Sequence, residues 1–263
     1  MNNKCVVVTG TVIPNISIHG HENLDAATRQ NEYEDITVRR NRYIETLSVY
    51  ASILNAPIFF LENSSYDFSK DIEFQNLFQK TNITLVKFPK SQFVERGKGF
   101  QEFEMIDEFV KSISGRYRAF LKLSGRYQYR NIKSLMDTQT DGLLIDMLRR
   151  WQVAITSIFF TTVDFYEEHL MDLYLEADDR QGAWIERRLY QKLSGKVFPQ
   201  RVQLFPIEPD LRDWTRSSAD KAGSAIARLK QPVRNVERAI LRRFGINELY
   251  LSWDHRSQTI LRR

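Results

Sequence analysis

The chain has 263 residues, 42% of them hydrophobic, so it can bury one sizeable core as a large α/β domain, alone or with an appendage. No stretch approaches eighteen consecutive apolar residues, and the start, MNNKCVVVTG, lacks a secretory-signal pattern, so we expect a cytoplasmic protein. The single cysteine, Cys5, excludes an internal disulfide and lies in a valine-rich run, which is typical of a small buried side chain.

The net charge of +5 is concentrated near the end of the chain. From Arg216 onward there are eleven Lys and Arg residues against four Asp and Glu residues, which leaves residues 1–215 slightly acidic. We therefore predict a main domain over 1–215 and a basic tail over 216–263. Such a tail favours a local electrostatic contact, and the chain shows no motif or aromatic-interleaved basic surface typical of nucleic-acid binding.

Strand and helix patterns alternate through the first 90 residues. Lys4 to Pro14 begins with a continuous β-branched run, which is typical of a strand buried on both faces. The elements expected next are a helix over Arg39 to Leu54, a strand over Ala56 to Asn63, a helix over Ile72 to Lys80 and a strand over Ile83 to Phe88. This alternation predicts an α/β fold with a mostly parallel central sheet flanked by helices.

Polar residues follow the first two predicted strands. They are Thr9, Gly10, Thr11, Glu62 and Asn63. In open α/β sheets ligands bind at the carboxyl ends of strands, so these residues can hydrogen-bond a nucleobase or a ribose. Two plainer alternatives remain open: residues 9–11 can be an ordinary strand-to-loop turn, and Asn63 with Ser64 can cap the turn that follows.

The stretch from Arg96 to Asn131 carries the densest set of candidate ligand-binding residues. Gly97-Lys98-Gly99 opens a helical pattern, and Glu102 falls in its first turn. A carboxylate there complements the positive end of the helix dipole, so capping is one role for Glu102. A contact with an acceptor hydroxyl or a sugar is the other.

A second predicted strand in this stretch, Ala119 to Leu123, runs into Ser124-Gly125-Arg126-Tyr127. Because side chains alternate along a strand, we expect Lys122 on the same side as Ser124 and Arg126. Such groups can form a cationic pocket for the diphosphate of a nucleotide, or simply a solvated strand edge.

Two short motifs in this stretch resemble a known family. Gly97-Lys98-Gly99-Phe100-Gln101-Glu102, followed by Leu121-Lys122-Leu123-Ser124-Gly125-Arg126-Tyr127 and Asn131, resembles the KGxxE and K-[TS]-GRY pattern of bacterial surface-polysaccharide glycosyltransferases with a GT-A-like fold. The similarity covers roughly residues 4–195. It implies transfer of a sugar from a nucleotide-activated donor to a glycan or lipid-linked acceptor, in the synthesis of polymers such as lipopolysaccharide O-antigen or capsule.

The resemblance also implies roles for individual residues. The diphosphate of the donor is assigned to Lys98, Lys122 and Arg126, with Ser124 beside them. The nucleoside is assigned to Thr9, Gly10, Thr11, Glu62 and Asn63. Many enzymes of this fold hold Mn²⁺ or Mg²⁺ with an Asp-x-Asp motif, but this chain has none. Metal use is therefore in doubt, no metal ligand or cofactor is assigned, and Arg126 with Lys122 can neutralise the leaving diphosphate instead.

In the rest of the main domain we expect two strands, over Gly142 to Arg150 and over Ala154 to Thr162. A helix from Asp164, a helix over Gly182 to Leu193 and a strand over Val202 to Ile207 are expected next. Glu186 lies near the start of the helix that ends at Leu193. It is placed as the general base of an inverting glycosyltransferase, with Glu102 as the second choice. The alternative is an exposed glutamate paired with Arg187 or Lys192, and retaining chemistry stays open.

The basic tail contains an amphipathic pattern over Ala225 to Phe244, with Pro232 suited to a first helical turn, so we expect two helical pieces that meet at Gln231. Its apolar positions are Ile226, Leu229, Val233, Val236, Ile240 and Phe244. This stripe either docks on the main domain or lies on the anionic inner face of the plasma membrane, which would make the protein peripheral. A non-catalytic nucleotide-binding or glycan-binding module at the membrane surface is therefore the alternative function.

Overall fold

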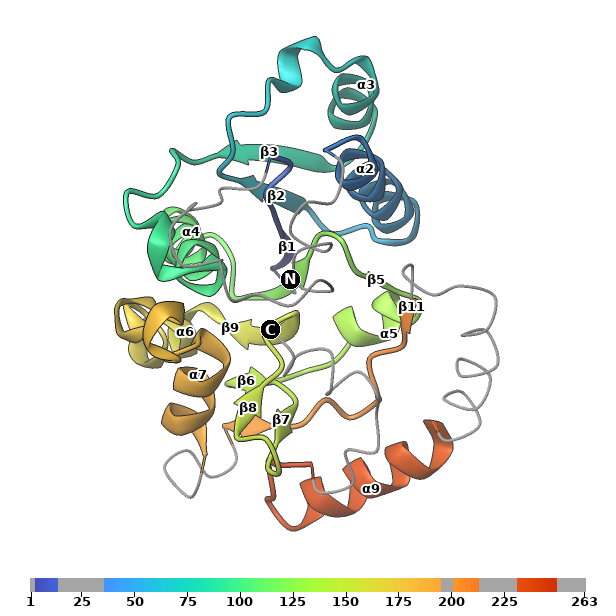
Figure 1. The fold of residues 1–263 in the computed structure, drawn as a ribbon. Helices are drawn as coiled ribbons and strands as arrows, with labels where there is room; N and C mark the ends of the chain where they lie inside the picture. The colour runs from blue at the N-terminus through green and yellow to red at the C-terminus, as the bar shows by residue number, and fades with distance from the viewer. Residues whose placement is uncertain (1–2, 14–35, 195–200, 213–230, 250–263) are drawn as a thin grey trace, which may run out of the picture.

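A computed structural model of the chain describes residues 3–13, 36–194, 201–212 and 231–249, and shows a central sheet with helices on both faces (Figure 1). The sheet has seven strands in the order β10-β6-β9-β4-β1-β2-β3. In chain order these are β1 (Lys4–Gly10), β2 (Ile58–Glu62), β3 (Ile83–Lys87), β4 (Ala119–Ser124), β6 (Leu143–Leu144), β9 (Ile158–Thr162) and β10 (Val202–Gln203). The predicted α/β class with a mostly parallel sheet is confirmed.

Strand β1 lies at the centre of the parallel part of the sheet. It pairs in parallel with β2 and with β4, and β2 pairs in parallel with β3. Only β9 runs the other way, antiparallel to both β4 and β6. Because β1, β2 and β4 run in the same direction, their carboxyl ends at Gly10, Glu62 and Ser124 lie along one edge of the sheet.

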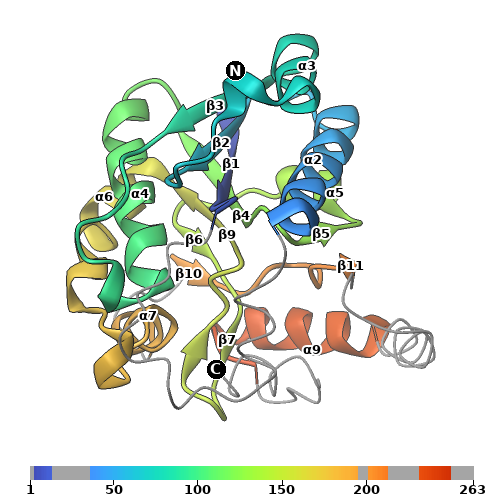
Figure 2. The same ribbon diagram turned by 45° about the horizontal axis from the view of Figure 1, so that its top comes forward.

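Helices cover both faces of the sheet (Figure 2). One face packs against α4 (Lys98–Ile113), α6 (Val163–His169) and α7 (Ile185–Leu193), and the other against α2 (Ile36–Ile53), α3 (Ile72–Lys80) and α5 (Ile132–Met136). Strand β1 serves both cores, because Val7 belongs to the first and Val6 and Val8 to the second. All three are fully buried, which explains the unbroken β-branched run that predicted this strand.

Short elements complete the described part of the chain. Single-turn 3₁₀ helices are formed by η1 (Phe68–Lys70), η2 (Val94–Arg96), η3 (Leu173–Glu176) and η4 (Asp179–Gln181). Two small antiparallel pairs lie outside the main sheet, β5 (Gln128–Tyr129) with β11 (Leu211–Arg212), and β7 (Met147–Leu148) with β8 (Val153–Ala154). No helix among these residues is long and apolar enough to span a bilayer.

Several predicted boundaries in the second half of the chain are wrong. The expected strand over 142–150 is divided into β6 and β7, and the one over 154–162 into β8 and β9. The interruption in the first lies at Ile145 and Asp146, and there the Asp146 side chain binds Arg238. Helix α7 begins at Ile185 because η4 and a bridge between Asp178 and Ala183 occupy the residues before it.

The helix expected from Asp164 begins one residue earlier, and the strand expected over 202–207 is shorter than predicted. Helix α6 begins at Val163, where Thr162 is the N-cap and accepts a hydrogen bond from the backbone N–H of Phe165, and it ends at His169. The chain then turns at Asp172, whose φ of 61° is left-handed. Strand β10 covers only Val202–Gln203.

Helix α9 (Gln231–Arg243) is the described part of the basic tail, and Pro232 lies in its first turn as predicted. The predicted domain boundary at 215/216 and the helical piece before Gln231 lie outside the described residues. The sequence left docking of the apolar stripe on the main domain as one alternative, and the structure shows the reverse. Arg238 is buried against Asp146, whereas Val236 and Ile240 are exposed.

Candidate functional site

The carboxyl ends of β1 and β4 meet the first turn of α4 in a compact polar cluster. Thr9 lies one residue before the end of β1 and donates its hydroxyl hydrogen bond to Oε1 of Glu102 on α4. Lys122 and Ser124 come from β4, where Ser124 pairs with Thr9 in the parallel register. Residues that lie up to 115 positions apart in the sequence therefore surround one carboxylate, because parallel pairing aligns the two strand ends.

Lys122 is fully buried at the centre of this cluster. Its Nζ lies 2.7 Å from Oε1 of Glu102, 2.6 Å from the backbone oxygen of Thr156 and 3.3 Å from Oγ of Ser124. A lysine ammonium has three N–H donors, so these three acceptors satisfy it. The predicted placement of Lys122 on the same side as Ser124 is confirmed, but direct binding of a diphosphate by Lys122 would require it to give up a protein acceptor.

Glu102 is held by one oxygen only. Lys122, Thr9 and Ser124 all direct their donors at Oε1, the last at 3.4 Å. Within the described part of the chain, Oε2 receives no hydrogen bond, and the side chain is 24% exposed. An anchored carboxylate with one oxygen open to a ligand is suited to accept a proton or a hydroxyl group from that ligand.

At the end of β2, Glu62 forms a second polar cluster of a different kind. Its carboxylate accepts hydrogen bonds from the backbone N–H of Val12 and of Ser64, each at 3.0 Å, and from the Ser64 hydroxyl. Glu62 is fully buried, and this burial raises the pKa of its carboxyl, against the effect of the hydrogen bonds. The carboxylate therefore ties the loop after β1 to the loop after β2.

The other residues predicted to bind a nucleoside lie beside these loops. The Thr11 hydroxyl donates to Oδ1 of buried Asn63 at 2.9 Å. The backbone N–H of Thr11 donates to the Tyr43 hydroxyl at 3.0 Å, and Arg39 donates to the Thr11 carbonyl at 2.5 Å. The sequence placed both residues only within a predicted helix and gave them no role, because neither belongs to a motif.

Two glycines allow α2 to approach the strand ends closely. A Cβ atom on Gly10 would lie 2.4 Å from the Phe60 ring and 3.1 Å from the Tyr43 ring, and one on Gly125 would lie 2.8 Å from the Tyr43 ring. The backbone N–H of Gly125 also donates to the Thr9 carbonyl at 2.8 Å. Both positions therefore exclude a side chain for reasons of space.

Glu186 lies on the other side of the Lys122 cluster. The buried Thr156 accepts from Lys122 through its backbone oxygen and donates its hydroxyl to Oε1 of Glu186 at 3.3 Å. Thr156 thus links the two carboxylates that the sequence proposed as bases. It lies in the loop between β8 and β9, where no sequence signal marked it.

Asp179 is a third carboxylate near Glu186 that sequence reasoning missed. Part of the residue is open to water, but its carboxyl is crowded by protein atoms. That crowding, followed by the Glu186 charge, raises the pKa of Asp179 to about 6, and Lys98 acts in the opposite direction. Asp179 accepts a hydrogen bond from the backbone N–H of Lys98, so it also caps the start of α4.

The two remaining predicted cations lie at the exposed edge of this region. Arg126 follows the end of β4 and is half-buried, and Lys98 is exposed in the first turn of α4. Both side chains have interaction partners, so their positive charges are not isolated. Because water reaches both, they are more accessible to an incoming anion than Lys122 is.

No metal site is formed by the described residues. Among them no three His, Cys, Asp or Glu side chains gather in a way that could hold an ion. His19 and His21 lie outside the described residues. The side chains at the carboxyl ends of β1 and β4 also do not match the ligand set of a divalent cation, because the Lys122 ammonium occupies the position next to Glu102.

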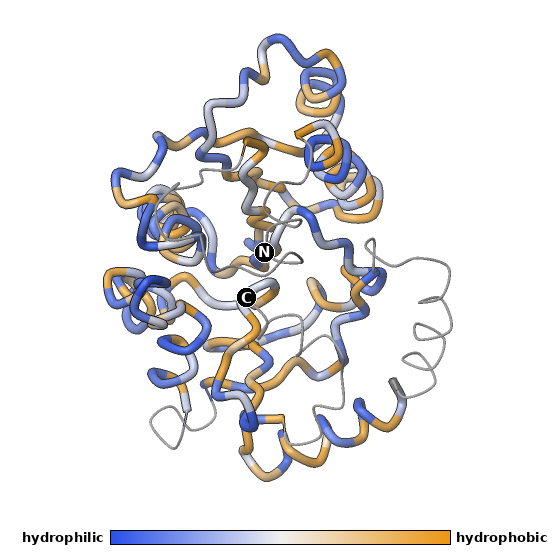
Figure 3. The backbone as a smooth tube through the Cα atoms, viewed as in Figure 1, coloured by the Kyte–Doolittle hydropathy of each residue, from blue (hydrophilic) through white to orange (hydrophobic). Residues whose placement is uncertain are grey.

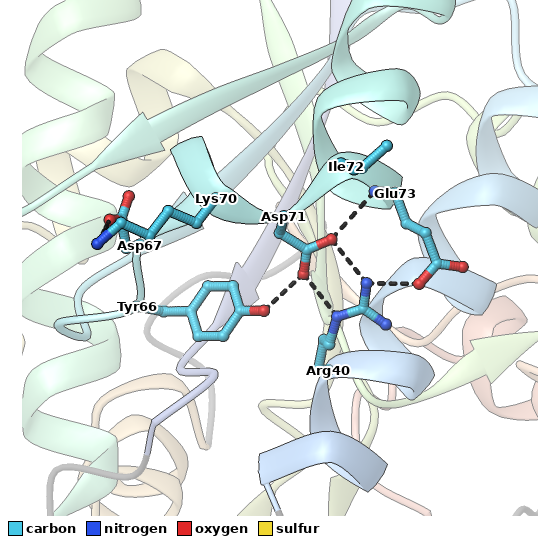
Figure 4. A pocket seen from close by; sticks show the side chains of 7 residues that line it. All are labelled: Arg40, Tyr66, Asp67, Lys70, Asp71, Ile72 and Glu73. Carbon is cyan, nitrogen blue, oxygen red and sulfur yellow. Dashed lines mark hydrogen bonds and ion pairs between the residues drawn. The ribbon is translucent and has the colours of Figure 1, made fainter.

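A separate, open cavity of about 480 Å³ lies between α2 and α3 (Figure 4). Arg40 and Asp71 form its floor through two hydrogen bonds of 2.5 and 2.6 Å, and Tyr66 donates to Asp71 at 2.5 Å. The Arg40 guanidinium holds the pKa of the Asp71 carboxyl well below its usual range. Asp71 is also the N-cap of α3, so these contacts fix the helix, and none of the predicted site residues lines the cavity.

Comparison with known proteins identifies no family. No protein-family model and no curated protein sequence matches the chain. A structure from Desulfovibrio desulfuricans G20, named as a nucleotide-diphospho-sugar transferase, has 11% identity and a TM-score of 0.42, over 73% of this chain and 76% of that one.

Two further solved structures give similar values. The WbbM bifunctional glycosyltransferase has 14% identity and a TM-score of 0.43, over 78% of this chain and 39% of that one. Mouse xyloside xylosyltransferase 1 has 9% identity and a TM-score of 0.42, over 84% of this chain and 92% of that one. We base the assignment of function on the side chains described above.

Proposed function

We propose that the chain is a glycosyltransferase that moves a sugar from a nucleotide-activated donor to an acceptor hydroxyl. The observation that carries this proposal is the Glu102 carboxylate, which lies where β1 and β4 end. It is anchored through Oε1, and no described residue binds its Oε2. The sheet supports it, because its strands, numbered in chain order within the sheet, run 3-2-1-4-6-5-7 with the sixth antiparallel. A mostly parallel sheet is what the resemblance to enzymes with a GT-A-like fold implies.

Glu102 fits the role of general base better than Glu186. In the reaction the acceptor oxygen attacks the anomeric carbon, the bond from that carbon to the donor phosphate breaks, and the diphosphate leaves with the electron pair. The acceptor proton must pass to a base within hydrogen-bond reach, and Oε2 of Glu102 is available for it. Glu186 is assigned to the acceptor side of the site, where Thr156 holds its Oε1.

The leaving diphosphate is assigned to Arg126 and Lys98. Both are accessible to water, and in the sequence Arg126 follows Ser124 by two residues and Lys98 precedes Glu102 by four. A guanidinium and an ammonium can neutralise the charge that develops on the departing phosphate oxygens. Lys122 is assigned a positioning role, because its ion pair fixes the Glu102 carboxylate.

The nucleoside is assigned to the loops after β1 and β2. Thr11 and Asn63 supply hydroxyl and amide groups there, and Glu62 holds the two loops together from inside. A glycan or lipid-linked acceptor in bacterial surface polysaccharide synthesis is the finer form of this proposal. Its support is the likeness of residues 97–102 and 121–127 to that family's motifs.

The test is turnover with a panel of nucleotide sugars that differ in base and sugar, measured as release of nucleotide with and without candidate acceptors. We expect release with at least one donor from the full chain. Glu102→Gln should abolish it, and Glu104→Gln, a neighbouring half-buried glutamate on α4, is the matched control. Tight nucleotide binding without turnover of any donor would instead indicate a non-catalytic binding module.

A further inference from the structure

The outward side of α9 is apolar. Val233, Val236, Ile240 and Phe244 are 64%, 59%, 52% and 73% exposed, and we call these four residues the outer face of α9. They recur at three- and four-residue steps, which places them on one side of the helix. Figure 3 shows hydrophobic residues alternating with hydrophilic ones along α9.

Charged side chains, in contrast, attach α9 to the rest of the protein. Arg238 is buried and makes two hydrogen bonds to Asp146, of 2.5 and 2.7 Å, and Arg234 donates to Glu208 at 2.6 Å. Arg242 donates to the backbone oxygen of Leu204. Leu241 is buried in a small apolar cluster, but the four residues of the outer face point away from it, whereas the usual amphipathic helix buries its apolar side. The arginines fix the helix with its apolar side outward.

Positive charge borders the outer face at its C-terminal end. Arg243 is exposed there, and the residues that follow α9 lead to the β7–β8 hairpin, where Leu249 donates its backbone N–H to the Met147 carbonyl at 2.8 Å. That turn carries exposed Arg150, whose guanidinium stacks 5.1 Å above the ring of half-buried Trp151. The only glutamates from 231 to 249, Glu237 and Glu248, are half-buried.

We propose that the outer face of α9 binds an anionic phospholipid surface. An interfacial helix inserts an apolar side at headgroup depth and places basic residues on the lipid phosphates, and the outer face with Arg150 and Arg243 provides both. The sequence from Arg216 onward adds a net charge of +7 to this end of the chain. A second copy of the chain on the same face would bring two positive borders together, so charge favours lipid.

This proposal does not depend on the proposed transferase activity. The experiment is co-sedimentation of the full chain with vesicles of phosphatidylcholine alone or mixed with phosphatidylglycerol. We expect binding to the mixed vesicles that weakens with added salt. Phe244→Asp should lower the affinity roughly tenfold or more, because it removes one buried aromatic side chain from the contact.

The matched control is Ile72→Asp. Ile72 on α3 is 73% exposed, the same fraction as Phe244, but lies away from α9, so its variant should bind vesicles like the wild type. Arg150→Glu should weaken binding to the mixed vesicles only. The proposal is overturned if the wild type binds no vesicle, if Phe244→Asp and Ile72→Asp bind equally, or if Phe244→Asp dissociates a dimer without changing vesicle binding.

Discussion

Two glutamates at the same edge of the sheet differ in how completely the protein satisfies them. Glu62 is fully buried, and both of its oxygens accept hydrogen bonds from neighbouring loops. Glu102 is 24% exposed, and its three donors all bind one oxygen. The difference indicates that Glu62 maintains the architecture of the strand ends, whereas Glu102 is prepared to act on a ligand.

The largest effect is expected from Glu102→Gln. An amide can keep the contacts of Oε1 but cannot take a proton, so turnover with an accepted donor should fall by about 10² to 10⁴. Donor affinity should change little, whereas the thermal unfolding midpoint should fall, because the buried Lys122 ammonium loses its charged partner. Steady-state kinetics with the best donor of the panel measures this. If Glu186→Gln has this effect instead, the contrast between Glu62 and Glu102 carries no catalytic meaning.

Asp107 is another carboxylate that the protein satisfies, and its effect on stability should depend on pH. It is buried on α4 and accepts from the Tyr166 hydroxyl at 2.6 Å and the Asp172 N–H at 2.7 Å, and its burial raises its pKa from 3.8 to about 6. The folded state therefore binds this proton more tightly than the unfolded state. Its contribution to stability is fully present below about pH 4 and is lost as the pH rises through about 6.

This loss amounts to about 3 kcal/mol of unfolding free energy, since one pKa unit corresponds to about 1.4 kcal/mol. Asp107→Asn should remove that pH dependence. Denaturant unfolding from about pH 4 to about pH 8, a range that brackets the titration of Asp107, measures this pH dependence in the wild type and in Asp107→Asn. Parallel pH profiles of the wild type and Asp107→Asn would show that Asp107 does not titrate in this range.

Glu62→Gln tests whether Glu62 maintains the architecture of the strand ends. The amide loses part of the acceptor capacity that serves Val12 and Ser64, so unfolding free energy should fall by about 1–3 kcal/mol. Turnover per folded molecule should fall far less than in Glu102→Gln. Chemical denaturation gives the first quantity and kinetics below the unfolding transition gives the second. A catalytic loss equal to that of Glu102→Gln would contradict the assignment.

The smallest effect is expected from Arg126→Ala. A charged hydrogen bond to a phosphate contributes about 1.5–3 kcal/mol, so donor KM should rise roughly tenfold or more. Arg130→Ala is the matched control, because Arg130 is exposed nearby and pairs with Asp210 instead. Isothermal titration with the nucleotide diphosphate checks the same contact without turnover. Unchanged affinity in Arg126→Ala would remove this residue from the diphosphate site.

The sequence predicted the parallel half of the sheet well, because β1 to β4 carry strong local patterns and alternate with helices. It did not predict β5 and β11, and it merged β7 and β8 into longer strands, because these two-residue strands exist only through tertiary pairing. In the site, alternation along β4 correctly placed Lys122 with Ser124. The ion pair of Lys122 with Glu102 depends on how α4 packs over the strand, and no local pattern encodes that distance.

The Tyr43 ring has a mechanical consequence for the whole edge of the sheet. It fills the space that side chains on Gly10 and Gly125 would need, and its hydroxyl accepts the hydrogen bond from the Thr11 N–H. The Tyr43 side chain therefore couples helix α2 to the end of β1 and to the turn after β4. A methyl group added at Gly125 would displace the ring, and the displacement would reach the β1 loop and the Arg126 turn together.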